Sequence, residues 1–165
     1  MKTKISSLIT VIVLFTFNSY SQTTDSVPPP VSQVKDFQIT LPKGAVQFTP
    51  DQMQWVAGPE ALPKGTKMCV LYGDMTKEGP FAIRLKLPAN QIIKLHVHKN
   101  DEVITVIEGA VMVGFGDRMQ MSKTKTFTAG SFYVNPAKEK HFVAIDKDGA
   151  TVQLNSMGPW GIDFK

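Results

Sequence analysis

From Phe37 onward the chain consists of short apolar segments of strand length, separated at regular intervals by turn-forming residues. The tripeptides at 42–44, 77–79 and 88–90 are clear stops, because each combines proline, glycine or asparagine with polar neighbours. This pattern predicts an all-β sandwich or barrel. The segments expected to be strands are 37–41, 67–73, 81–87, 91–98, 102–108, 110–115, 123–128, 131–134, 140–146 and 151–155.

Helical signals are confined to residues 48–55. Thr49 is expected to cap a helix there, with Pro50 at its first position and Gln52 completing a capping box. Gly58 and Pro59 follow within about two turns and end it. We therefore expect a short helix or a single helical turn in an otherwise all-β domain.

Side chains with metal-ligand chemistry recur at a spacing that β structure can bring together. His96 and His98 share one face of an extended strand, because side chains at i and i+2 point the same way. We expect Glu102 to return from the neighbouring strand of a β-hairpin, and His141 is the fourth candidate. The chain has three histidines, and all three occupy these positions. The alternative is a chance pairing on a solvent face or a barrel without metal.

These residues resemble the two motifs of the cupin superfamily. The first motif is a glycine, five residues, His-x-His, three or four residues, glutamate, six residues and glycine; the second is a glycine, five residues, Pro-x-Gly, two residues and histidine. The positions that match the first are His96, His98, Glu102 and Gly109. Those that match the second are Gly130, Pro136 and His141.

The chain departs from the cupin pattern at three positions. Asn90 stands where the first motif begins with glycine, a mild change because asparagine tolerates the left-handed conformation better than most residues. Lys138 replaces the glycine of Pro-x-Gly, and Ile145 replaces an asparagine that often ends the second motif. All four ligand positions are intact. The resemblance covers roughly residues 79–146.

The resemblance implies a single jelly-roll β-barrel that holds one divalent transition-metal ion through His96, His98, Glu102 and His141. Three imidazoles and one carboxylate suit Fe, Mn, Ni, Co or Zn, and leave positions for a small oxygenated molecule. Dioxygenase-like or isomerase-like chemistry is one implied function. A noncatalytic exported module that binds a ligand or senses metal or oxidant is the other. Homodimers are common for this fold, which makes a homodimer one candidate state.

The first 21 residues have the features of a secretory signal peptide. Lys2 and Lys4 form a basic start, an apolar stretch covers 8–17, and small residues flank position 20 before Gln22. The apolar stretch is much shorter than the roughly 20 residues that span a bilayer. We therefore expect export to the periplasm or the exterior, with no stable membrane insertion after cleavage. Residues 22–36 read as a proline-containing linker and 37–165 as the barrel domain.

Charge and composition argue against other classes of function. Cleavage would lower the formal net charge from +4 to +2, since Lys2 and Lys4 are the only charged residues of the signal. Nucleic-acid binding would need a clustered basic face, so we expect a small-molecule partner and no nucleic acid. No Ser-His-Asp or Cys-His arrangement and no phosphate-binding loop competes with the histidines.

The remaining conspicuous side chains have structural interpretations. Cys69 is the only cysteine and is expected to be a small buried apolar residue. Trp55 and Trp160 could stack on a substrate, but core packing or the covering of one barrel end is the favoured role, because large aromatic side chains usually serve burial.

Overall fold

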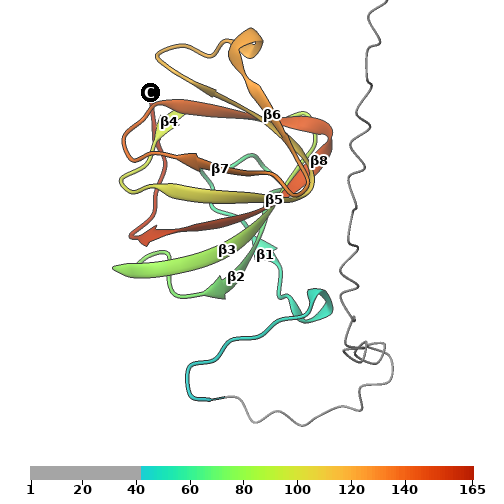
Figure 1. Cartoon of the computed structure of the whole chain (residues 1–165), viewed down its shortest axis with the longest axis vertical. Coiled ribbons are helices and arrows are strands. Elements are labelled where there is room, and N and C mark those ends of the chain that lie inside the picture. The colour runs from blue at the N-terminus through green and yellow to red at the C-terminus, as the bar shows by residue number, and fades with distance from the viewer. Residues whose placement is uncertain (1–41) are drawn as a thin grey trace, which may run out of the picture. The chain divides into compact units, whose positions relative to one another are not determined.

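The structure, a computed structural model, describes residues 42–165 and is built almost entirely of strands (Figure 1). The expected export signal (1–21), linker (22–36) and strand 37–41 all lie outside the described residues. The elements in chain order are the 3₁₀ helix η2 (Pro50–Gln52), β1 (Val56–Ala57), β2 (Lys67–Tyr72), β3 (Gly79–Leu87), β4 (Ile92–Val97), β5 (Glu102–Phe115), the 3₁₀ helix η3 (Met121–Lys123), β6 (Lys125–Thr128), β7 (Phe132–Asn135), β8 (His141–Gly158) and β9 (Asp163–Phe164).

β5 and β8 are each longer than the sequence predicts. β5 runs through both expected strands 102–108 and 110–115, and β8 runs through 140–146 and 151–155. The expected breaks are wrong: the pairing of β5 with β8 shifts register between Val106 and Glu108 and again between Gly109 and Val111. Such irregularities bend a strand without ending it. Both strands therefore turn a corner of the barrel.

The two bent strands join two groups of strands into one barrel. Residues 103–109 of β5 pair with 150–155 of β8, and this half continues through β3, β2 and β1 on one side and β7 on the other. Residues 111–115 of β5 pair with 141–145 of β8. This second half extends from β8 to β4 and β9, and from β5 to β6. Figure 1 shows β4 and β6 on one side of β5, and β2 and β3 on the other. This arrangement confirms the expected jelly-roll fold.

The hairpin expected between His98 and Glu102 is not formed. β4 pairs with β8 and β9, whereas β5 pairs with β6, β7 and β8. The loop between β4 and β5 instead carries the chain from one half of the barrel to the other. Strands adjacent in sequence often pair, but a jelly roll distributes them between two layers. Glu102 therefore reaches the histidines from the other half of the barrel.

The barrel interior is filled by apolar side chains, which alternate with less buried residues along β3 and much of β5 but are buried without a break over residues 141–145 of β8. On β5, Ile104 and Val106 are buried, and on β8, Val143 and Ile145 are buried. Burying each such side chain contributes about 1.5–3 kcal/mol before conformational entropy is counted. The same cluster includes Phe81, Ile83, Leu85, Leu87, Ile93, Val111, Val113, Val152 and Leu154. Cys69 is also buried, with 2% of its surface exposed, which confirms its expected role.

Two turns adopt the left-handed conformation without glycine. Asn90 has φ of 57° and Lys138 has φ of 66°, at the positions where the cupin motifs carry glycine. Both positions thus adopt a conformation that favours glycine although neither carries one. A left-handed residue other than glycine costs about 1–2 kcal/mol, so the surrounding contacts must hold Lys138 in place.

The expected helix is present but short. η2 covers three residues and has the expected capping box, in which the backbone N–H of Thr49 donates to Oε1 of Gln52 at 3.0 Å. The chain then enters β1 before reaching Gly58. No helix in the part of the chain from 42 to 165 is long and apolar enough to cross a membrane.

Candidate metal centre

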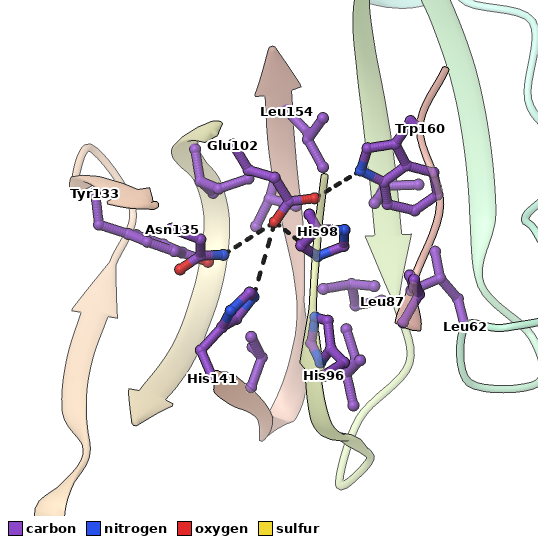
Figure 2. Close-up of a pocket in the computed structure, with 16 residues that line it drawn as sticks. Leu62, Leu87, His96, His98, Glu102, Tyr133, Asn135, His141, Leu154 and Trp160 are labelled. Carbon is purple, nitrogen blue, oxygen red and sulfur yellow. Dashed lines mark hydrogen bonds and ion pairs between the residues drawn. The ribbon is translucent and has the colours of Figure 1, made fainter. Parts of the chain in front are cut away.

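The four predicted site residues come together at one end of the barrel interior. His96 lies on β4, His98 follows that strand, and Glu102 and His141 are the first residues of β5 and β8. His96 and His141 face each other as paired positions of adjacent strands. All four side chains are buried, with no more than 4% of any residue exposed. Figure 2 shows them turned toward one another.

Backbone carbonyls fix the tautomer of each imidazole. The Nδ1 atoms of His96, His98 and His141 lie 2.6, 2.7 and 3.0 Å from the carbonyl oxygens of Lys94, Gly161 and Glu139. A carbonyl only accepts, so each Nδ1 carries the proton and donates it. Each Nε2 is therefore left with its lone pair. Histidine ligands of metals typically make such a bond through the ring nitrogen that does not bind the ion.

The three imidazoles converge on one point. One ring nitrogen from each histidine lies within 4.8 Å of the corresponding atoms of the other two. Nε2 of His141 is buried and has no hydrogen-bond partner within residues 42–165. A buried hydrogen-bond acceptor without a partner lowers the stability of the fold. We therefore expect this nitrogen to have a partner that the protein chain itself does not supply.

Burial keeps two of the imidazoles neutral. Burial, reinforced by the proximity of His141 and opposed by the Lys94 carbonyl, lowers the pKa of His96 to about 4. Burial likewise lowers the pKa of His141. A neutral imidazole is the form that binds a metal ion, so these histidines have lone pairs available near neutral pH.

Glu102 places a carboxylate oxygen beside two of the three imidazoles. Its Oε2 lies 3.2 Å from Nε2 of His98 and 3.9 Å from Nε2 of His141. With Nδ1 of His98 donating to a carbonyl, two lone pairs face each other across the shorter distance, and a cation shared between them would relieve the repulsion. Two ligands at right angles, each about 2.1 Å from an ion, lie about 3 Å apart. The donor set and this distance therefore fit a metal ion.

Two further residues hold Glu102, and the sequence interpretation did not assign them to the site. The Trp160 indole donates from Nε1 to Oε1 of Glu102 at 2.7 Å, and Asn135 donates from Nδ2 to Oε2 at 3.0 Å (Figure 2). Trp160 also packs against the barrel core, which confirms its expected structural role. That expectation did not include the hydrogen bond to Glu102. Trp55, by contrast, is partly exposed and lies under the ammonium group of Lys86.

A small apolar cavity adjoins the centre. Its volume is about 40 Å³, much smaller than the roughly 300–1,000 Å³ typical of drug-sized ligand pockets. Tyr133 also lines it, and burial, together with the nearby Glu102, raises the pKa of its phenol so that the hydroxyl stays protonated. The apolar walls are formed by Leu62, Leu85, Leu87, Ile93, Ile104, Val143, Val152, Leu154 and Ile162.

Comparison with protein families finds one match, which covers most of the described chain. The family is described as a ChrR cupin-like domain, and the match spans residues 43–158. It therefore includes all four predicted site residues. A comparison with curated proteins gives no match.

Solved structures with a similar fold agree with this assignment. The polyketide cyclase RemF from Streptomyces resistomycificus superimposes with a TM-score of 0.59 at 15% identity, over 72% of this chain and 83% of that one. An RmlC-like cupin from Shewanella frigidimarina gives 0.51 at 18% identity, over 67% and 87%. KdgF from Halomonas sp. gives 0.50 at 17% identity, over 66% and 90%. At these identities the likeness shows the fold alone.

Proposed function

This chain belongs to the ChrR cupin-like family of the cupin superfamily, and we propose that it binds one divalent transition-metal ion through His96, His98, Glu102 and His141. The observation that carries the proposal is the common orientation of the three imidazoles. Each donates from Nδ1 to a backbone carbonyl and leaves Nε2 for an ion.

Three nitrogens and one carboxylate oxygen form a donor set suited to Fe, Mn, Ni, Co or Zn. An ion held there supplies a Lewis acid that polarises an oxygen atom of a bound molecule. The chain's own contribution is orientation and exclusion of water. The carbonyls of Lys94, Gly161 and Glu139 fix the imidazoles, and the apolar walls of the cavity keep bulk solvent away.

The ligand we propose is a small oxygenated organic molecule, and we favour a metal-dependent enzyme of dioxygenase-like or isomerase-like type. Support comes from the apolar surroundings, in which a charged or polarised oxygen interacts strongly with a cation. Glu102 is the candidate proton acceptor, since it is the carboxylate nearest the imidazoles. Oxygen uptake with a panel of small diols and enols tests the proposal directly.

A second candidate is a noncatalytic module that binds a ligand or senses metal or oxidant. The size of the cavity, about 40 Å³, favours it, because so little space admits only a molecule of a few atoms unless the barrel end opens. The two candidates differ in what Glu102 does after the ion is bound.

Glu102→Gln separates the two candidates. For an enzyme that uses Glu102 to move protons, turnover per bound ion should fall roughly 10²-fold. The amide also places an NH2 group against the N–H of Trp160 or of Asn135, so metal affinity should fall as well. Activity must therefore be divided by metal content measured on the same sample. Loss of activity in proportion to lost metal would contradict a catalytic role for Glu102.

We also propose that the protein is exported after removal of residues 1–21. The support is the basic start and the short apolar stretch of the sequence. N-terminal sequencing and intact mass of the protein expressed with its full N-terminus should show a chain that begins near Gln22 and carries no lipid. An uncleaved chain in the membrane fraction would contradict the proposal.

A further inference from the structure

The segment 159–162, which follows β8, contacts two of the four proposed ligands. Nε1 of Trp160 donates to Oε1 of Glu102 at 2.7 Å, and the carbonyl of Gly161 accepts from Nδ1 of His98 at 2.7 Å. The indole also stacks on the His98 ring, with centroids 5.5 Å apart and planes inclined by 17°. One short segment thus orients ligands from both halves of the barrel (Figure 2).

Backbone contacts hold this segment in position. The N–H of Trp160 donates to the carbonyl of Met75 at 2.8 Å, and the side chain of Asn100 donates to the carbonyl of Met157 at 2.8 Å. Gly158 packs so closely on the Lys77 carbonyl that an added Cβ would lie 2.1 Å from its oxygen. The backbone of Trp160 is therefore held by contacts that do not involve Glu102, and the ring itself also packs against the core and His98.

The two carboxylate oxygens of Glu102 have different partners. Oε1 is engaged by Trp160, whereas Oε2 faces the histidine nitrogens and accepts from Asn135. A carboxylate can bind a metal through one oxygen or through both. With Oε1 held by the indole, only Oε2 is oriented toward the point where the imidazoles converge.

We propose that Trp160 is a positioning residue that restricts Glu102 to binding through one oxygen and so preserves a coordination position for a small exogenous ligand. This inference rests on the proposed metal binding. It assigns a specific task to the indole N–H, separate from the packing of the ring against the core and His98. Without that N–H, Oε1 can rotate toward the ion and occupy the position that a small ligand would take.

The test uses the cobalt-loaded full chain and azide as the small ligand. Trp160→Phe keeps an aromatic ring but lacks the N–H, and replacement of Trp160 by benzothienylalanine removes only the N–H from a ring of the same shape. Both variants should change the visible spectrum of bound cobalt and lower azide affinity at least about tenfold, the usual effect of losing a partner of a metal ligand. The matched control is Trp55→Phe, whose ring contacts Lys86; it should match the wild type.

The outcomes distinguish this inference from the proposed function. If the wild type takes up no cobalt, both the metal site and the role of Trp160 are wrong. If the wild type is loaded and the benzothienylalanine variant has the same spectrum and azide affinity, the role of Trp160 alone is overturned. Thermal unfolding of the metal-free forms identifies any variant that fails to fold. If Trp160→Phe fails to fold, the benzothienylalanine variant tests the role of Trp160.

Discussion

Replacing any one of His96, His98 or His141 with alanine should lower metal affinity at least about tenfold. Each substitution removes a direct bond to the ion, and loss of even an indirect partner typically costs 10–100-fold. The effect should be largest for His141, which has no exposed surface and whose Nε2 has no other partner within the described residues. Competition with a chelator, followed by elemental analysis, measures the affinity of each variant.

The matched control is Gln153→Ala on β8, because Gln153 contacts Arg84 and does not line the cavity beside the histidines. Its metal affinity should equal that of the wild type. Circular dichroism should show that all the histidine variants retain β structure, since the apolar cluster is untouched. Full metal content in all three histidine variants would show that the site is assigned to the wrong residues.

Gly109→Ala should destabilise the domain by more than about 3 kcal/mol. Gly109 has φ of 69°, and an added Cβ would lie 2.1 Å from the Gly149 carbonyl oxygen, where β5 and β8 bend together. The left-handed conformation alone costs alanine about 1–2 kcal/mol, and the collision with backbone must then be relieved by moving one strand. Urea unfolding of the metal-free protein measures the change in the free energy of unfolding.

Gly130→Ala controls for the conformational part of this effect. Gly130 has φ of 84°, but an added Cβ there would meet nothing within 4 Å. Gly130→Ala should therefore lower the free energy of unfolding by only about 1–2 kcal/mol, the cost of placing alanine in the left-handed conformation. Equal losses in the two variants would show that the close approach of β5 to β8 at Gly109 does not matter for stability.

The His-x-His spacing and the resemblance to the cupin motifs were together sufficient to predict which four side chains gather at the site. Alternation along the strand that carries Glu102 accounts for the burial of Ile104 and Val106, whereas on β8 both faces of residues 141–145 are buried. The same local reasoning anticipated that Asn90 would tolerate a left-handed turn, and its φ of 57° confirms this. These features depend on the residue itself and its nearest neighbours along the chain.

Strand pairing was not predictable in the same way. A hairpin between His98 and Glu102 was the natural expectation from a short loop between two apolar segments, yet β4 pairs with β8, which begins more than 40 residues later. The choice depends on which distant strand closes the barrel. The continuity of β5 through Gly109 was missed for a related reason, since a glycine that ends a strand and one that bends it look alike in sequence.

The partners of Glu102 also required the fold. Asn135 pairs with Glu102 across β7 and β5, a register that the expected strands did not specify. Trp160 follows β8, and its aromatic character alone favoured packing, the commoner role of such residues. The signal available in the sequence was the indole N–H, which needs a hydrogen-bond partner when it is buried. Only the folded chain identifies that partner.

The metal content of the untagged wild-type protein tests the central claim most directly. Elemental mass spectrometry on protein purified without a histidine tag, and again after incubation with each of Fe, Mn, Ni, Co and Zn, should find about one ion per chain. The variant with His96, His98 and His141 all replaced by alanine should hold none under the same conditions. A folded wild type that binds none of these ions, or a triple variant that binds as much as the wild type, would contradict the account.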